Sequence, residues 1–179
     1  SAVLSALTGA SVEEVTGRGG GLTDAAFLKK KHVIEHALSL HAPDKNDPID
    51  VLSKVGGFDL CAMTGVFLGA AIERIPVVVD GFISIDAALC ASRLASHAKA
   101  YFIGSHRSFE IGYRLAEQEL GLHPCLELGM RLGEGSGCPI AFRVVEAACA
   151  VMCTMATFPE AAINDKYLTD IRAKDSFTV

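Results

Sequence analysis

The stretch Pro76-Val77-Val78-Val79-Asp80-Gly81 decides the fold class of this sequence. Its three consecutive valines form a β-branched run, which is typical of a strand buried on both faces of a parallel sheet. The run ends in an acid and a glycine, and in open α/β sheets ligands bind at the carboxyl ends of the strands. The stretch therefore predicts a parallel sheet whose edge presents Asp80 and Gly81 to a ligand.

Helix and strand patterns alternate around this run. Residues 58–74 and 84–97 have helical patterns, and 100–103 is predicted to be a second short strand. A helix that ends at Gly121 precedes a third strand candidate at 125–128. This alternation predicts an α/β fold with a parallel sheet covered by helices on both faces, in a Rossmann-like three-layer arrangement.

Three polar turns follow the predicted strands, at 80–84, 104–108 and 129–137. In a parallel sheet they share one edge, so we expect their side chains to form a single small-molecule site. This convergence is more informative than any one of the turns.

The third turn contains Met130-Arg131-Leu132-Gly133-Glu134-Gly135-Ser136-Gly137. A single carboxylate, Glu134, lies between glycines, which can adopt positive φ and let a ligand approach closely. Pro139 suits the first turn of the apolar helix expected at 140–158, whose unpaired N–H groups would point back at the loop. We therefore expect an ionised Glu134 that faces a ligand-sized gap. The alternative is a glycine-rich turn with a solvated glutamate.

A second glycine-rich loop, Gly17-Arg18-Gly19-Gly20-Gly21, precedes a helix expected at 25–41, with Thr23 and Asp24 as N-caps. A glycine loop that runs into a helix start beside cations is a common way to hold phosphate. The P-loop ending and the third glycine of the dinucleotide fingerprint are both missing. Phosphate binding and a flexible turn both fit this loop. The predicted apolar side of the helix consists of Phe27, Leu28, Val33, Ile34, Ala37 and Leu38.

Composition limits the classes of function. The chain has 179 residues, half of them hydrophobic, and a formal net charge of −5, which suits one folded domain and argues against nucleic-acid binding. No signal peptide is visible, and the longest apolar run, 147–158, is too short for a membrane span. We therefore expect a soluble, cytoplasmic protein without a membrane partner. The cysteines indicate a reducing compartment, with Cys149 and Cys153 expected to be buried thiols.

The segment His32-Val33-Ile34-Glu35-His36 matches the H-x-x-E-H zinc pattern of inverted metalloproteases. Both histidines would share one helix face, and Glu110 is a candidate for a distant third ligand. Three lysines directly precede the pattern, and histidines on the polar side of a helix are usually solvated. We therefore expect no metal and no cofactor, and keep a zinc hydrolase as a minor alternative.

Several of these segments together resemble the nicotinate-nucleotide–dimethylbenzimidazole phosphoribosyltransferase family. They are the loop 130–137, the stretch Val55-Gly56-Gly57-Phe58-Asp59-Leu60, the strand end Asp80-Gly81-Phe82 and the turn Ser105-His106, in the same order and at similar spacing. The resemblance covers almost the whole chain. It implies an enzyme of cobalamin lower-ligand assembly that transfers phosphoribose from nicotinate mononucleotide to 5,6-dimethylbenzimidazole, releasing nicotinate and forming α-ribazole 5′-phosphate.

The resemblance also implies roles for individual residues. Glu134 corresponds to the general base, and a carboxylate suits attack by a ring nitrogen, because it can take the proton of the neighbouring N–H. Gly19 and Lys30 would hold the 5′-phosphate, although Lys29 or Lys31 could replace Lys30. The remaining substrate-binding residues are Gly81 and Ser108 at the nicotinate portion, Leu132 in the base pocket, and Asp80 at the strand end.

Parts of the family pattern are absent from the sequence. A Gly-Asn-Thr-Thr loop of the phosphate site would lie just before Ser1, and most of the benzimidazole pocket comes from the family's N-terminal half. Residues 1–7 also have the pattern of the second half of a helix, closed by Gly9. We therefore expect the C-terminal half of a homodimeric enzyme, which needs its other half for a complete site and for full activity.

The expected domains are an α/β core at 1–158 and a helical segment with a tail at 159–179, which includes a surface helix at 166–174 and belongs to a smaller helical domain. Two other functions stay open. The acceptor could be another benzimidazole, a purine or a phenol. The chain could also be a non-catalytic fragment that retains only structural contacts.

Overall fold

The computed structural model describes residues 1–164 and 169, and the chain divides into two compact units, Ser1–Phe142 and Arg143–Val179. The sheet lies in the first unit. Helix α8 (Gly137–Thr154) begins in the first unit and ends in the second. The domain boundary expected after residue 158 stays a prediction. The surface helix predicted at 166–174 lies outside the described residues, apart from residue 169.

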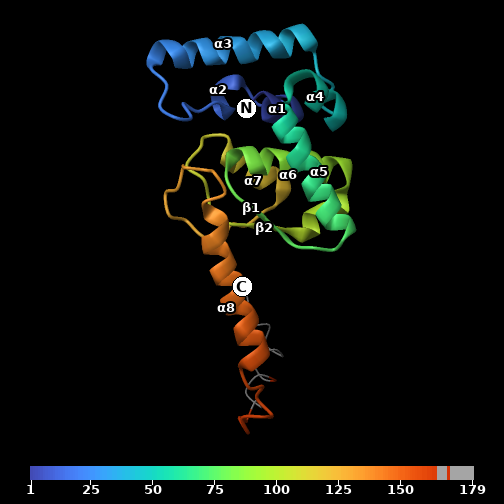
Figure 1. Cartoon of the computed structure of the whole chain (residues 1–179), viewed down its shortest axis with the longest axis vertical. Coiled ribbons are helices and arrows are strands. Elements are labelled where there is room, and N and C mark those ends of the chain that lie inside the picture. Colours follow the sequence, from blue (N-terminus) through green and yellow to red (C-terminus); the bar gives the residue numbers. More distant parts are fainter. Residues whose placement is uncertain (165–168, 170–179) are drawn as a thin grey trace. The chain divides into compact units, whose positions relative to one another are not determined.

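Two short strands form the sheet. Strands β1 (Val77–Val79) and β2 (Phe102–Gly104) pair in parallel, with Val78 opposite Ile103. They are joined by α6 (Phe82–Leu94), which Figure 1 labels, and by the 3-10 helix η1 (Ser96–Tyr101). The valine run is therefore a strand of a parallel sheet, as predicted, and the α/β class is confirmed. The three-layer arrangement stays a prediction.

The prediction of a regular third strand at 125–128 is wrong. In the described chain this segment makes one isolated parallel bridge, between His106 and Leu126. Pro124 packs so closely on the end of β2 that a Cβ on Gly104 would lie 2.9 Å from the Cα of Pro124. Proline has no N–H for a ladder, and Gly129, at φ 63, turns the chain away soon afterwards. The segment therefore lies beside β2 without forming a strand.

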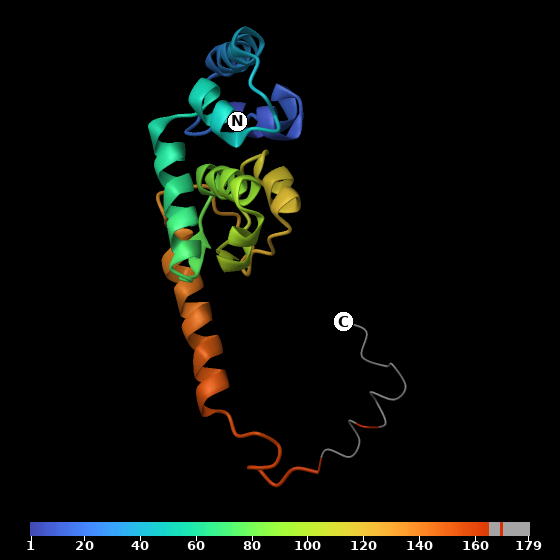
Figure 2. The same cartoon turned by 90° about the vertical axis from the view of Figure 1, so that its right-hand side faces the viewer.

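Helices pack around the sheet and bury the core. Helix α5 (Phe58–Ile72) covers β2 through an edge-to-face contact of Phe67 and Phe102, whose ring centroids are 5.0 Å apart. Helices α5 and α6 lie side by side (Figure 2). Helix α7 (Tyr113–Leu120) packs on α6 and ends at Gly121 in the left-handed conformation, as predicted. These helices hold the sheet edge in a fixed place.

Four helices precede α5 in the chain: α1 (Ala2–Thr8), α2 (Val12–Val15), α3 (Asp24–His41) and α4 (Pro48–Val55). Gly9 ends α1 at φ 78, and Ser11 and Glu14 form a complete capping box at the start of α2. Helix α3 packs on the other three (Figure 1). The end of α1 at Gly9 is therefore as predicted.

The inner side of α3 is narrower than predicted. Phe27, Ile34 and Leu38 are half-buried, whereas Leu28 and Val33 are each 57% exposed. The expected apolar side is corrected accordingly, because a helix periodicity of 3.6 places Phe27, Ile34 and Leu38 on one stripe and turns Leu28 and Val33 away from it.

Helix α8 corrects two further expectations. It is the one described helix that is long and apolar enough to cross a membrane by length and composition, because its 18 residues begin ten positions before the run 147–158. Core helices of soluble proteins meet the same criterion, so this property does not by itself indicate a membrane protein. Cys149 and Cys153 are exposed, not buried, and all six cysteines are free. The burial of an apolar helix depends on its tertiary contacts, which the pattern of the helix alone does not specify.

Candidate active site

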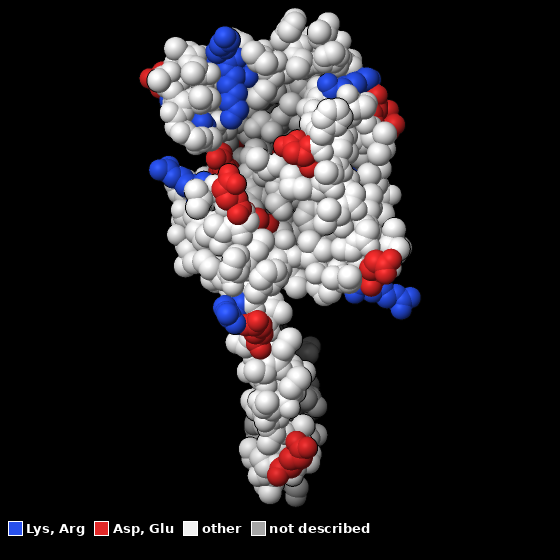
Figure 3. Space-filling model, viewed as in Figure 1, with Lys and Arg blue, Asp and Glu red and all other residues white. Residues whose placement is uncertain are grey.

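A cavity of about 740 Å³ lies at the carboxyl edge of the sheet, within the first unit. Its volume suits a small-molecule ligand. Figure 3 shows acidic side chains gathered around a hollow beside α3. All seven residues expected at the site line this cavity: Gly19, Lys30, Asp80, Gly81, Ser108, Leu132 and Glu134.

The three polar turns meet at this cavity. A Cβ on Gly81 would lie 3.9 Å from the Cα of Gly133 and 4.0 Å from Ser108 Oγ. Directly after the second turn, Phe109 N donates to Met130 O of the third turn at 2.9 Å. The predicted convergence of the turns at one sheet edge is therefore confirmed.

Glu134 occupies the most unusual backbone of the site. It has φ 57, and Gly133 and Gly135 on either side both have φ 72, so three successive residues are left-handed. A glutamate in this region is strained, whereas glycine is not. The turn directs the exposed Glu134 side chain to the cavity wall. A carboxylate at this position can accept a proton or a hydrogen bond from a ligand.

The first turn of α8 is capped by Asp80. Its Oδ1 accepts a hydrogen bond from Gly137 N at 2.8 Å, and its Oδ2 accepts one from Gly135 N at 3.1 Å. The first N–H group of α8, which the sequence suggested would point back at the loop, is therefore directed at Asp80. Asp80 can cap α8 because the tertiary fold places the end of β1, with its buried carboxylate, beside the start of α8.

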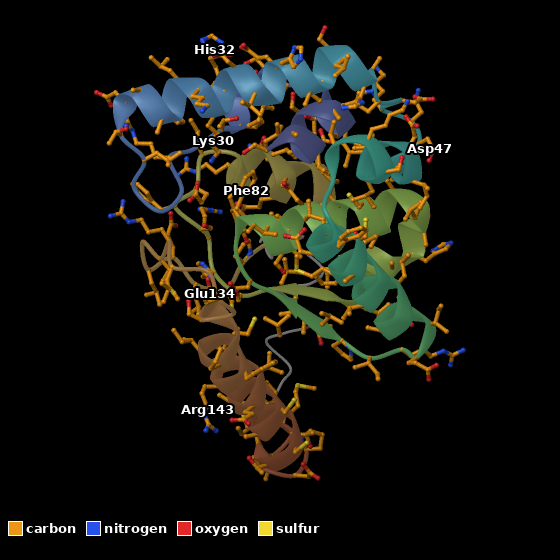
Figure 4. The ribbon with its side chains drawn as sticks, turned by 45° about the horizontal axis from the view of Figure 1, so that its top comes forward. Lys30, His32, Asp47, Phe82, Glu134 and Arg143 are labelled. Atoms are coloured by element: carbon orange, nitrogen blue, oxygen red, sulfur yellow. The ribbon has the colours of Figure 1, made fainter. Side chains whose placement is uncertain are left out.

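Lys30 is the lysine of α3 that reaches the cavity. Its Nζ donates to Gly17 O at 2.7 Å and would lie 3.9 Å from a Cβ on Gly19, which has φ 60. Lys31 lies over the Phe27 ring and 3.9 Å from Glu13, and Lys29 is exposed. Figure 4 shows Lys30 on the inner side of α3 and His32 on the outer side. A cation and a glycine-rich loop thus meet at one end of the cavity.

A protein-family model described as "Phosphoribosyltransferase" matches residues 1–163. The chain belongs to this phosphoribosyltransferase family. A relative from Clostridium perfringens named nicotinate-nucleotide–dimethylbenzimidazole phosphoribosyltransferase is 55% identical, over 99% of this chain and 49% of its own length. A relative of the same name from Roseiflexus sp. is 51% identical, over 93% of this chain and 47% of its own length.

The crystal structure of CobT from Thermus thermophilus matches with a TM-score of 0.85 at 35% identity, and the match covers 92% of this chain and 49% of that chain. The mixed α/β fold of this chain is therefore shared with CobT. The chain spans about half the length of the relatives that it matches.

The sequence analysis missed Glu110 as a residue of this cavity and considered it only as a zinc ligand. Its half-buried side chain lines the wall, so close to the glycine loop that a Cβ on Gly17 would collide with its Oε2. Its position two residues after Ser108, in the second polar turn, was the available signal. Phe82, the first residue of α6, also lines the wall; it was named as part of the motif 80–82 but not as a site residue.

The zinc pattern does not come together with a third ligand. His32 and His36 are exposed on α3, while Glu110 lies in the cavity. Among the described residues, no three His, Cys, Asp or Glu side chains are grouped to hold a metal ion. Cys138 also lines the cavity, where burial and then the nearby Asp80 raise the pKa of its thiol. A protonated thiol is a poor nucleophile, so Glu134 and Lys30 are the groups best suited to chemistry.

Proposed function

We propose that the full-length protein containing this chain transfers phosphoribose from nicotinate mononucleotide to 5,6-dimethylbenzimidazole, giving α-ribazole 5′-phosphate and nicotinate. The names of the relatives support this reaction. The structural observation that carries it is that one cavity holds a carboxylate on a glycine-rich turn, Glu134, and a cation beside a second glycine-rich loop, Lys30.

The phosphate end of the substrate is assigned to Lys30 and Gly19. Lys30 Nζ donates to a backbone carbonyl at 2.7 Å and has two further protons to offer. Gly19, at φ 60, and the following Gly20 and Gly21 are exposed. A compact ammonium beside an exposed glycine-rich loop is a suitable site for a phosphate dianion.

The nicotinate portion is assigned to Gly81 and Ser108. A side chain at Gly81 would extend toward Gly133 and Ser108, so glycine leaves this part of the wall open. Ser108 is 6% exposed, and its hydroxyl can donate to a carboxylate of the substrate. Leu132, which is 73% exposed on the catalytic turn, is assigned to the acceptor base.

Glu134 is the proposed general base. A ring nitrogen of the acceptor attacks C1′ as the bond from C1′ to the nicotinate nitrogen breaks, and nicotinate leaves with that electron pair. The acceptor gains positive charge, which its other N–H relieves by giving a proton to the Glu134 carboxylate. The carboxylate also stabilises the positive charge that develops on the sugar. Attack opposite the leaving group converts the β-nucleotide into the α-product.

We further propose that this chain is the C-terminal half of the enzyme and that the other half completes the site. Ser1 and Ala2 line the cavity, so residues that precede them would reach it directly. Large apolar side chains are also left uncovered, such as Phe58, 97% exposed, and Ile72, 78% exposed. Additional strands would complete a three-layer sheet, and residues 159–179 would join a smaller helical domain. A homodimer and a cytoplasmic location stay predictions from the sequence.

The acceptor is the least constrained part of the proposal. Leu132 is the one residue here that the family resemblance assigns to the base pocket, and its side chain is mostly exposed. Another benzimidazole, a purine or a phenol is therefore the second candidate acceptor. A panel of these acceptors, assayed with the full-length protein, separates the candidates by kcat/KM. A non-catalytic protein would bind no nicotinate mononucleotide in a calorimeter.

The decisive test is Glu134→Gln in the full-length protein. We expect kcat to fall by about 100- to 10,000-fold, the usual contribution of a general base. Nicotinate mononucleotide should still bind, because the amide keeps the size of the side chain. Glu73→Gln removes the same charge from an exposed position outside the cavity and should leave kcat unchanged. Retention of wild-type turnover by Glu134→Gln would refute the proposed mechanism.

A further inference from the structure

The carboxylate of Asp80 is buried at the end of β1, with the residue 7% exposed. Each of its oxygens already accepts a backbone N–H, from Gly135 at 3.1 Å and from Gly137 at 2.8 Å. Hydrogen bonds to an ionised acceptor are among the strongest in proteins. Both oxygens of the Asp80 carboxylate therefore bind the backbone of the turn that carries Glu134.

The turn needs an external contact of this kind. Gly133, Glu134 and Gly135 are all left-handed, a conformation that costs about 1–2 kcal/mol for a residue with a side chain. Within the turn, Ser136 N donates to Gly133 O at 2.9 Å and Cys138 N donates to Gly135 O at 3.0 Å. Those bonds close the turn on itself, whereas the bonds to Asp80 attach it to the sheet.

His106 supports Asp80 from the second polar turn. It is fully buried, with Nδ1 3.8 Å from Asp80 Oδ1 and 3.0 Å from Ser105 Oγ. The ring packs so tightly on the start of α8 that a Cβ on Gly137 would collide with Nδ1. Asp80 and His106, which follow β1 and β2, thus pack together against Gly137 at the end of the turn that carries Glu134.

We infer that Asp80 is a positioning residue, which fixes the Glu134 carboxylate by holding the amides of Gly135 and Gly137, with His106 as its support. This inference rests on the proposed function, in which Glu134 is the base. It replaces the substrate-binding role that the sequence suggested for Asp80. Asp80 contributes to catalysis through Glu134, because misplacing a base by about 1 Å can cost about 100-fold in rate.

The first test is Asp80→Asn in the full-length protein. Asparagine turns an NH₂ group toward one of the two amides, so one hydrogen bond is lost and two donors face each other. We expect kcat to fall by about 10- to 100-fold, with KM for nicotinate mononucleotide within about 3-fold of wild type. A KM rise of about 10-fold or more at unchanged kcat would instead assign Asp80 to direct substrate binding and overturn the inference.

The double variant Asp80→Asn/Glu134→Gln separates this inference from the proposed function. If Asp80 acts through Glu134, the double variant is no more than about 2-fold slower than Glu134→Gln alone. Losses that multiply would mean that Asp80 acts independently, and the inference would fail while the proposed base stands. Wild-type activity of Glu134→Gln would refute the proposed function whatever Asp80→Asn does.

Amide hydrogen exchange provides a readout that does not depend on activity. In Asp80→Asn, residues 133–138 should exchange about 10-fold faster or more, whereas residues 17–22 should be unaffected. Unchanged exchange in 133–138 would overturn the inference. Asp50→Asn is the matched control, because Asp50 also accepts a backbone amide, from Asp44 at 2.8 Å, but lies outside the cavity. It should lower thermal stability and leave kcat within about 2-fold.

If Asp80→Asn does not fold, His106→Gln tests the same contact. It leaves both amide bonds of Asp80 in place and removes the ring that supports them. We expect a kcat loss of about 3- to 10-fold at unchanged KM, with no additional loss on top of Glu134→Gln. A change confined to KM would count against the positioning role.

Discussion

Two glycine-rich loops of this protein each lead into an 18-residue helix, yet they are held in different ways. The loop before α3 is closed locally, since Thr23 Oγ1 accepts from Ala26 N at 3.4 Å and Arg18 pairs with Asp24. The turn before α8 is held by Asp80, which lies 57 positions earlier than Gly137.

The loop before α3 therefore has room to change conformation, whereas the turn before α8 is held in one conformation. A Cβ on Gly20 or Gly21 would meet nothing within 4 Å, so the middle of the first loop has space to close on a ligand, although Gly17 at its start packs against Glu110. At Gly137 the same atom would collide with a buried ring. A phosphate site tolerates adjustment, whereas a general base must be fixed before the substrate arrives.

The largest expected difference between the two loops appears when one methyl group is added to each of them. Gly137→Ala would place Cβ against His106 and 2.8 Å from Asp80 Oδ1, and neither neighbour has room to move. We expect a loss of about 3 kcal/mol in stability, the upper range for overpacking, and a drop in kcat of about 100-fold. Gly20→Ala should leave both the free energy of unfolding and kcat close to their wild-type values. Thermal unfolding and steady-state kinetics of the full-length variants measure both, and equal effects at the two positions would abolish the distinction.

An intermediate effect is expected at the cation beside the first loop. Lys30→Met keeps the aliphatic length of the side chain and removes its charge, so KM for nicotinate mononucleotide should rise by about 10-fold, or about 1.4 kcal/mol of binding free energy. Lys29→Met is the matched control, because Lys29 is exposed and outside the cavity. The assignment of the phosphate to Lys30 would be wrong if Lys29→Met weakened binding more.

The smallest effect is expected at the local cap. Thr23→Ala removes the oxygen that accepts from Ala26 N and should cost about 1 kcal/mol of helix stability, while Thr23→Ser should restore most of it. Because this cap is local, hydrogen exchange should rise in the first turn of α3 and leave residues 133–138 unchanged. Faster exchange in both loops would show that they are coupled after all.

Much of this fold was predictable because its signals are local. A few neighbouring residues specify the backbone state at the valine run 77–79, at the N-cap Thr23, and at the terminating glycines Gly9 and Gly121. The predicted third strand failed because the effect of Pro124 on pairing depends on its contact with Gly104, which is distant in sequence. Cys149 and Cys153 were misjudged for a related reason, since burial depends on what packs against a helix.

The sequence by itself determined which chemical groups the site contains and that three polar turns share one sheet edge, because strand outlets follow from periodicity and turn residues. Only the tertiary structure decided what each group does there. Lys30 reaches the cavity, and Lys29 and Lys31 do not, because the rotation of α3 is set by packing. Asp80 caps α8 because folding brings together two backbone positions that no local rule relates, and the hydrogen bonds that join them exist only in the folded chain.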